Sequence, residues 1–123
     1  MTPDDFVRRY EAATNAHDLA GTLELIAADA AYLFSDRTTH IGKAAISDAL
    51  AANFDSIRNE TYAIAGLRWL AVSDDIAVCV YEFGWSGEIN GEAASGGGRG
   101  TSVLRRSDER WLVVHEHLSA GAL

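Results

Sequence analysis

Cysteine, proline and basic residues are all scarce in this chain of 123 residues. The single cysteine, Cys79, cannot form an internal disulfide, so we expect a reducing compartment. One proline leaves little room for disordered linkers. Eighteen acidic residues against ten basic ones give a formal net charge of −8. Because nucleic acids and anionic membranes are held mainly by Lys and Arg, we expect neither as a partner.

Long apolar runs are also missing. No stretch approaches the roughly 18 apolar residues of a membrane span, and the opening MTPDDFVRRY lacks the apolar segment of a secretory signal. We therefore expect a cytoplasmic protein. The length and the hydrophobic fraction of 48% fit one domain over residues 1–123. The run GGGRG lacks the Lys-Ser/Thr ending of a phosphate-binding loop, and we expect no cofactor.

Helical signals occupy the first half of the chain. Thr2 and Pro3, followed by two aspartates, predict the start of a first helix. Asp18 predicts the cap of a second, shorter helix that reaches Ile26. A short strand over 32–34 and an extended piece over 38–41 come next, and Gly42 then opens a third helix.

Strand signals fill the second half. Strands are predicted over 61–72, 76–86 and 92–106, and a polar turn at 107–110 leads to a final strand that reaches Ser119. The glycine cluster at 95–98 predicts a bulge or sharp bend. Helices followed by an antiparallel meander predict an α+β domain, in which three helices pack on a strongly curved, mostly antiparallel sheet. A bent sheet covered by helices leaves room for an interior pocket.

Glu116 is the strongest candidate for chemistry, because it lies between apolar residues of the final strand. If it faces the pocket, burial would raise the pKa of its carboxyl toward neutrality, which suits proton transfer. The alternative is an ion pair with an arginine of the adjoining strand, Arg99, Arg105 or Arg106.

The histidines that flank Glu116 allow three interpretations. His115 and His117 are two residues apart and share one strand face, so they could clasp a metal, act as acid and base, or form a structural network or subunit contact. No third metal ligand lies at suitable spacing, so we expect no metal and favour the structural role.

Aromatic residues alternate along the strand over 76–86. Tyr81, Phe83 and Trp85 project from one side, and with Tyr10 and Phe34 they could line an apolar cavity. The alternative is that they simply pack in the core.

Three segments resemble the nuclear-transport-factor-two-like, or SnoaL-like, superfamily of cone-shaped, cystatin-like α+β domains. FVRRYEAATNAHDLAGTLELIAADAAYLF is similar to its two leading helices and first strand, and HIGKAAISDAL to its third helix. The ending RGTSVLRRSDERWLVVHEHLSAGA resembles the branch that includes the calcium/calmodulin-dependent kinase II association domain, where His115, His117 and Ser119 are matching positions.

The resemblance implies a pocket without implying one reaction, because the superfamily includes ketosteroid isomerase, polyketide cyclases and dehydratases. Tyr10 matches the oxyanion-stabilising tyrosine of the isomerase. Phe34 stands at the position of its base, and Ser102 approximately at that of its second acid. Asp36 could replace the base only in a different strand register. We therefore expect no steroid-type isomerase activity.

The resemblance also orients the final strand. It implies that Val114, Glu116 and Leu118 face the pocket, whereas His115, His117 and Ser119 lie on the opposite face. In the kinase association domain the position of Leu118 is cationic, and here it is apolar, so a carboxylate-binding pocket of that type is not expected.

We thus expect a domain that binds a small apolar or amphipathic ligand in an interior pocket, either as a binding domain alone or as an isomerase-, cyclase- or dehydratase-type enzyme. Tyr10 and Glu116 would supply the proton chemistry. The expected ligand contacts are Phe34, Tyr81, Phe83, Trp85, Ser102 and Leu118. The alternative is a non-catalytic homodimeric association module. Its outer sheet face would present Trp111, Val113, His115 and His117, with Arg99 and Ser119 in the same network.

Overall fold

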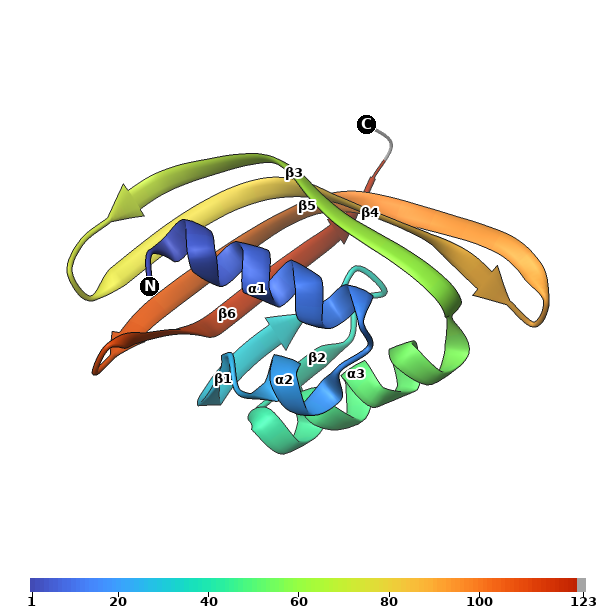
Figure 1. The fold of residues 1–123 in the computed structure, drawn as a ribbon, viewed down its shortest axis with the longest axis horizontal. Helices are drawn as coiled ribbons and strands as arrows, with labels where there is room; N and C mark the ends of the chain where they lie inside the picture. The colour runs from blue at the N-terminus through green and yellow to red at the C-terminus, as the bar shows by residue number, and fades with distance from the viewer. Residues whose placement is uncertain (122–123) are drawn as a thin grey trace.

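The computed structural model describes residues 1–121, which form three helices and one six-stranded sheet (Figure 1). The helices are α1 (Pro3–Asn15), α2 (Leu19–Leu23) and α3 (Lys43–Ser56). The strands are β1 (Ile26–Leu33), β2 (Thr39–Ile41), β3 (Arg58–Val72), β4 (Ile76–Ile89), β5 (Glu92–Ser107) and β6 (Arg110–Ala120). The predicted α+β class, with helices on a curved and mostly antiparallel sheet, is confirmed.

The sheet has the order β2-β1-β6-β5-β4-β3, and only the β1–β6 pair is parallel. It does not close into a barrel. In Figure 1 the long strands β3, β4 and β5 arch over α1, and the helices lie on the concave side. A hollow between helices and sheet is the geometric consequence of this curvature.

The helix starts follow from local chemistry. The Thr2 hydroxyl accepts a hydrogen bond from the Asp5 amide and the Asp5 carboxylate accepts one from the Thr2 amide, which together form a capping box. Asp18 caps α2 through the Gly21 amide. Gly42 precedes α3 with a φ of +86°, a conformation that favours glycine. All three starts were predicted from the sequence.

The boundary between α2 and β1 differs from the prediction. The helix ends at Leu23, and Ile26 is the first residue of a strand that was expected only over 32–34. Ile26 pairs with Val113 of β6, and further pairing resumes from Ala31 after a register shift. The alanine-rich sequence of β1 has little strand propensity, so pairing and burial against β6 decide its conformation.

The glycines of β5 do not form the expected bulge, because the β4–β5 pairing continues through them without a register shift. Each inward aromatic of β4 is instead paired with a glycine of β5: Tyr81 with Gly100, Phe83 with Gly98 and Trp85 with Gly96. A Cβ at Gly100 would lie 2.3 Å from the Tyr81 ring, and one at Gly96 would lie 2.6 Å from the Trp85 indole nitrogen. Gly96 and Gly100 therefore make space for the rings of Trp85 and Tyr81, whereas a Cβ at Gly98 would clash with the Ser119 carbonyl of β6.

A bulge occurs in β6, at Val114. Val113 pairs with Leu104 while His115 pairs with Val103, so Val114 has no partner on β5. The extra residue places Trp111 and Val113 on the same inner face as Glu116. Trp111 is 4% exposed and Val113 is 1% exposed, both in the core. The expectation that these two residues lie on the outer face with His115 and His117 is wrong for this reason.

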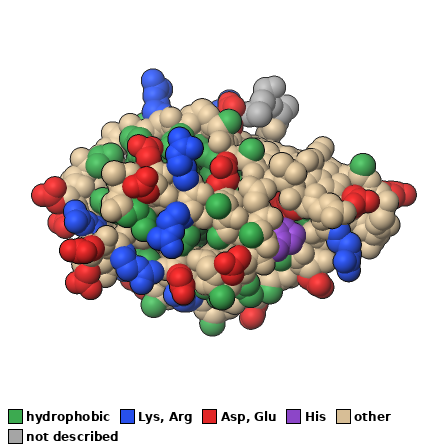
Figure 2. Space-filling view, in the orientation of Figure 1, with side chains coloured by type: hydrophobic (Ala, Val, Ile, Leu, Met, Phe, Trp, Pro, Cys, Tyr) green, Lys and Arg blue, Asp and Glu red, His purple; other side chains and the backbone are tan. Residues whose placement is uncertain are grey.

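The core lies between the helices and the sheet. Its main cluster joins residues of α1, β1, α3 and the inner face of β4 to β6, and a smaller cluster lies beneath β3 and β4 around Cys79. Charged side chains of both signs are interspersed on the surface in Figure 2, without a continuous basic patch on that face. No helix in the described residues is long and apolar enough to cross a membrane.

Candidate functional site

A cavity of about 240 Å³ lies between α1, α3 and the concave face of the sheet. Its wall is mostly aromatic and aliphatic, with three carboxylates. The lining residues are Tyr10, Thr14, Phe34, Ser35, Asp36, Leu50, Asn53, Phe54, Ile57, Glu60, Tyr62, Phe83, Trp85, Glu116 and Leu118. An apolar cavity with a few polar groups is typical of small-molecule sites.

Glu116 occupies the inner end of this cavity. It projects from β6, is only 5% exposed, and accepts a hydrogen bond of 3.1 Å from the Tyr10 hydroxyl of α1. Burial raises the pKa of its carboxyl from 4.5 to about 7, against the opposing effect of the hydrogen bond from Tyr10. At neutral pH such a group is divided between its acid and base forms.

Two tyrosine hydroxyls form a hydrogen-bonded group with Glu116. The Tyr10 hydroxyl lies 2.8 Å from the Tyr32 hydroxyl of β1, so three polar groups meet in an otherwise apolar interior. Burial and the neighbouring Glu116 carboxylate raise the pKa of both phenols well above its usual value. Both tyrosines therefore stay protonated and act as hydrogen-bond donors rather than bases.

The Glu116 carboxyl borders open space. Its Oε2 accepts a hydrogen bond from the Tyr10 hydroxyl, and a hydrogen bond from Tyr32 also lowers its pKa. Glu116 lines the cavity, and it also lines the small void beside Tyr81. Its carboxyl is therefore within reach of a ligand in the cavity.

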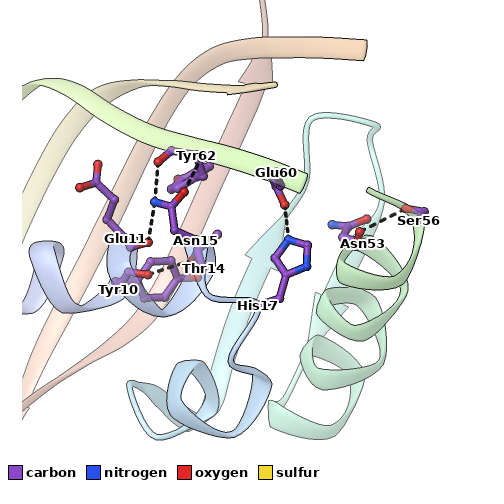
Figure 3. Close-up of polar contacts among 9 residues, drawn as sticks. All are labelled: Tyr10, Glu11, Thr14, Asn15, His17, Asn53, Ser56, Glu60 and Tyr62. Carbon is purple, nitrogen blue, oxygen red and sulfur yellow. Dashed lines mark hydrogen bonds and ion pairs between the residues drawn. The ribbon is translucent and has the colours of Figure 1, made fainter. Parts of the chain in front are cut away.

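A second carboxylate, Glu60, lies at the other end of the cavity. Its Oε1 is 2.7 Å from Nε2 of His17, which follows α1 (Figure 3). The His17 ring stacks on Phe54 of α3, with centroids 4.4 Å apart and an interplanar angle of 11°. These contacts join the end of α1, the start of β3 and α3 at the mouth of the cavity.

The helix α1 also holds the free edge of β3. The Asn15 side chain donates to the Tyr62 carbonyl at 2.7 Å and accepts from the Tyr62 amide at 2.8 Å (Figure 3). The Glu11 carboxylate accepts from the Ile64 amide at 2.7 Å. These bonds satisfy backbone groups that an edge strand otherwise exposes. They also fix the part of β3 that carries Glu60 into the cavity.

The structure places four of the six expected ligand contacts in the cavity wall: Phe34, Phe83, Trp85 and Leu118. Tyr81 and Ser102 do not reach this cavity. Their hydroxyls bond to each other at 2.8 Å and line a separate void of about 20 Å³ behind Glu116. The Tyr81 ring lies over Gly100, and its phenol is a packing group whose hydrogen-bond partner is Ser102.

The alternative ion pair for Glu116 does not form. Arg105 instead pairs with Asp29 at 3.0 Å on the outer face. Arg99 is exposed and its backbone is paired with Ser119 of β6. Within the described residues, Glu116 has no cationic partner.

The two histidines of β6 lie outside the cavity. His115 Nδ1 is 2.9 Å from the Ala31 carbonyl, and the His115 and His117 ring centroids are 6.4 Å apart. Among residues 1–121, no three His, Cys, Asp or Glu side chains lie together as a metal site would require. The geometry of His115 is that of a structural contact between β1 and β6.

Asp36 lies at the cavity mouth, but its carboxylate is already hydrogen-bonded within a turn. Its carboxylate accepts from the Thr38 amide at 2.9 Å and from the Thr38 hydroxyl at 2.5 Å. These hydrogen bonds lower the pKa of Asp36, so the group stays ionised and is a poor proton acceptor. It is therefore less suited than Glu116 to serve as a base.

His17 and Glu60 were not among the site residues predicted from the sequence. A signal for Glu60 was present, because Glu60, Tyr62 and Ile64 alternate along the strand and share one face. No comparable signal identified His17, which follows a helix and reaches Glu60 across 43 residues of sequence.

Comparison with known proteins gives a family and a fold. Residues 4–122 match the family model for the SnoaL-like domain. No curated protein matches the chain in sequence.

Solved structures show the same fold at low identity. A Salmonella enterica protein of the nuclear-transport-factor-two-like superfamily has a TM-score of 0.86 and 18% identity, over 97% of this chain and 88% of that one. A Xanthomonas campestris protein provisionally named a calcium/calmodulin-dependent kinase II association domain has a TM-score of 0.84 and 19% identity, over 96% and 84%. A Novosphingobium aromaticivorans protein provisionally named an aromatic ring hydroxylase has a TM-score of 0.88 and 18% identity, over 98% and 87%.

Proposed function

Because the chain belongs to the SnoaL-like domain family, we propose that it binds a small amphipathic molecule in its cavity and exchanges a proton with it through Glu116. One observation carries this proposal: a buried carboxyl with a pKa of about 7, bonded to Tyr10, lines the cavity. A buried carboxylate that did not border a cavity would have only a structural role.

The arrangement suits removal of a proton from a carbon next to a carbonyl group. The Glu116 carboxylate takes the proton, while Tyr10, bonded to its Oε2, keeps the carboxylate in place. A base with a pKa near the working pH combines a useful ionised fraction with adequate strength. The aromatic walls of Phe34, Phe83 and Trp85 hold the carbon skeleton. Isomerisation, cyclisation and dehydration all begin with this step.

The test uses 2-tetralone, a neutral bicyclic ketone with acidic hydrogens next to its carbonyl. Hydrogen–deuterium exchange at these positions is followed by proton NMR in D₂O, with wild type, Glu116→Gln and the exposed control Glu92→Gln. We expect exchange above the buffer rate for wild type and control, and a loss of about 10²-fold or more in Glu116→Gln, the usual contribution of a general base. Equal rates in wild type and Glu116→Gln contradict the proposal.

A second candidate function is self-association through the outer face of the sheet. Two cross-strand rows on this face contain no charged residue: Val78–Val103–His115 and Val80–Thr101–His117. An uncharged strip across three strands favours contact with a second copy. Light scattering tests it: we expect a dimer for wild type and a monomer for Val103→Glu. A wild type that is monomeric at high concentration excludes this candidate.

A further inference from the structure

The mouth of the cavity carries a group that selects ligands by charge. Resting on the proposed function, we infer that Glu60, held by His17, anchors the outer end of the ligand through a hydroxyl or a protonated amine, and that the cavity rejects acids. Glu116 then acts on the inner end of the same molecule.

Glu60 is positioned for this role by burial and by one fixed hydrogen bond. Its side chain is 7% exposed, against 25% for His17. Its Oε1 is bonded to His17 Nε2, and no hydrogen bond to Oε2 exists within the described residues. Glu60 lines the cavity, so this second oxygen is within reach of a ligand there. A ligand donor is the natural partner for this oxygen.

The charge of the cavity wall points to the same ligands. Asp36, Glu60 and Glu116 line the cavity, and no Lys or Arg does. His17 lies behind Glu60 and its ring is stacked on Phe54, so it supports the carboxylate rather than facing the ligand. A carboxylate or phosphate ligand would meet three carboxylates and no cation, with only neutral donors such as Asn53 and Tyr62 to bind it, which disfavours its entry.

The two carboxylates are held by different parts of the chain. Glu116 is bonded to Tyr10 within α1, and Glu60 is bonded to His17, two residues beyond the end of α1. Both line the cavity of about 240 Å³, which therefore fits a small molecule with two polar groups and an apolar body against Phe83 and Trp85.

Three probes of similar shape test the selection: 2-naphthylmethylamine, 2-naphthylmethanol and 2-naphthoic acid. At pH 7 the first is cationic, the second neutral and the third anionic. Dissociation constants are measured by calorimetry for wild type, Glu60→Gln, Glu116→Gln and Glu92→Gln. Gln keeps the shape of Glu60 and can still accept from His17, and a thermal melt of each variant verifies folding.

We expect wild type to bind the amine most tightly and the acid most weakly. In Glu60→Gln the preference for amine over acid should fall by about tenfold or more, since hydrogen bonds to charged groups contribute roughly twice those between neutral groups. Glu92→Gln should leave the preference unchanged, and in Glu116→Gln the preference should fall less than in Glu60→Gln. This pattern supports the inference.

Other outcomes separate the inference from the proposed function. Equal binding of the three probes, an unchanged preference in Glu60→Gln, or a preference lost only in Glu116→Gln overturns the role of Glu60 and leaves the cavity as a ligand site. Absence of binding by all three probes overturns the inference as well, and exchange of 2-tetralone then decides the proposed function alone.

Discussion

The two ends of the cavity use the same kind of side chain in different surroundings. At the inner end, Glu116 is surrounded by apolar groups and contacts a phenol, Tyr10, which carries no charge. At the mouth, Glu60 contacts an imidazole, His17, which is partly exposed. Burial thus raises the proton affinity of the first carboxyl, while the second has a partner able to carry the opposite charge. The inner end is suited to move a proton and the mouth to hold a ligand.

The largest expected effect concerns Glu116, at the inner end of the cavity. Replacing it by Gln should raise the unfolding free energy relative to wild type, and the gain should depend on pH. The pKa of Glu116 is raised from 4.5 to about 7, so between these values the folded state binds more protons than the unfolded state. The unfolding free energy of wild type therefore falls as pH rises through this window, by about 3 kcal/mol. Because Gln carries no charge at any pH, the unfolding free energy of Glu116→Gln should not fall in this way.

Denaturant unfolding at pH 4 and pH 8 measures this effect. The unfolding free energy of Glu116→Gln should be higher than that of wild type at pH 8, and the difference should become smaller toward pH 4. Glu92→Gln, at an exposed hairpin position, should show no such pH-dependent difference. If Glu116→Gln were less stable than wild type at pH 8 and equally stable at pH 4, the ionised Glu116 would stabilise the fold, and the expected direction of the pH effect would be wrong.

The next effect concerns Tyr10. Tyr10→Phe removes the hydroxyl that bonds both Glu116 and Tyr32, which should cost about 1–3 kcal/mol of unfolding free energy. Because this hydrogen bond lowers the pKa of Glu116, its loss should move that pKa upward from about 7. Carboxyl ¹³C NMR titration of Glu116 measures the shift.

Tyr62→Phe is the matched control, since the Tyr62 hydroxyl has no hydrogen-bond partner in residues 1–121. A downward shift of the Glu116 pKa in Tyr10→Phe would contradict the stabilisation of the ionised carboxylate by Tyr10.

A smaller effect is expected for the connection between α1 and β3. Asn15→Ala removes two hydrogen bonds to the Tyr62 backbone, and we expect a loss of roughly 1–2 kcal/mol. Hydrogen exchange should become faster at the Tyr62 amide, with amides in the interior of the β4–β5 pairing as the reference. Unchanged protection of Tyr62 would show that the Asn15 side chain does not hold this edge.

The smallest effect on stability is expected at the mouth. Glu60→Gln keeps an acceptor for His17 and removes a charge from a partly exposed pair, so the unfolding free energy should change by less than about 1 kcal/mol. Chemical denaturation measures it beside Glu116→Gln at pH 7. A loss above about 2 kcal/mol would make Glu60 a structural element of the fold rather than a ligand anchor.

Much of the site was predictable, because alternate residues of a strand lie on opposite faces of the sheet. Period-two spacing placed Phe83 and Trp85 on one side of β4, and helical spacing placed Tyr10 on the buried side of α1. Both rules work as long as the register is continuous. They failed at β6, where the unpaired Val114 turns Trp111 and Val113 inward, because a one-residue slip exchanges the two faces.

The glycines of β5 illustrate a different limit. A glycine cluster is compatible with a bulge, a bend or a close neighbour, and the chain itself does not distinguish them. The close neighbours of Gly96 and Gly100 are aromatic rings of β4 and those of Gly97 and Gly98 are backbone atoms of β4 and β6, which are identified only once the strand registers are known.

The sequence alone determined the fold class, the helix starts, the inward aromatics and the candidacy of Glu116, because caps, turn residues and apolar periodicity act between residues close in the chain. The tertiary structure decided which groups meet. Tyr10 reaches Glu116 across 106 residues, and His17 reaches Glu60 across 43. Such pairings depend on sheet order, curvature and one bulge, and these arise from burial of the whole core rather than from any local segment.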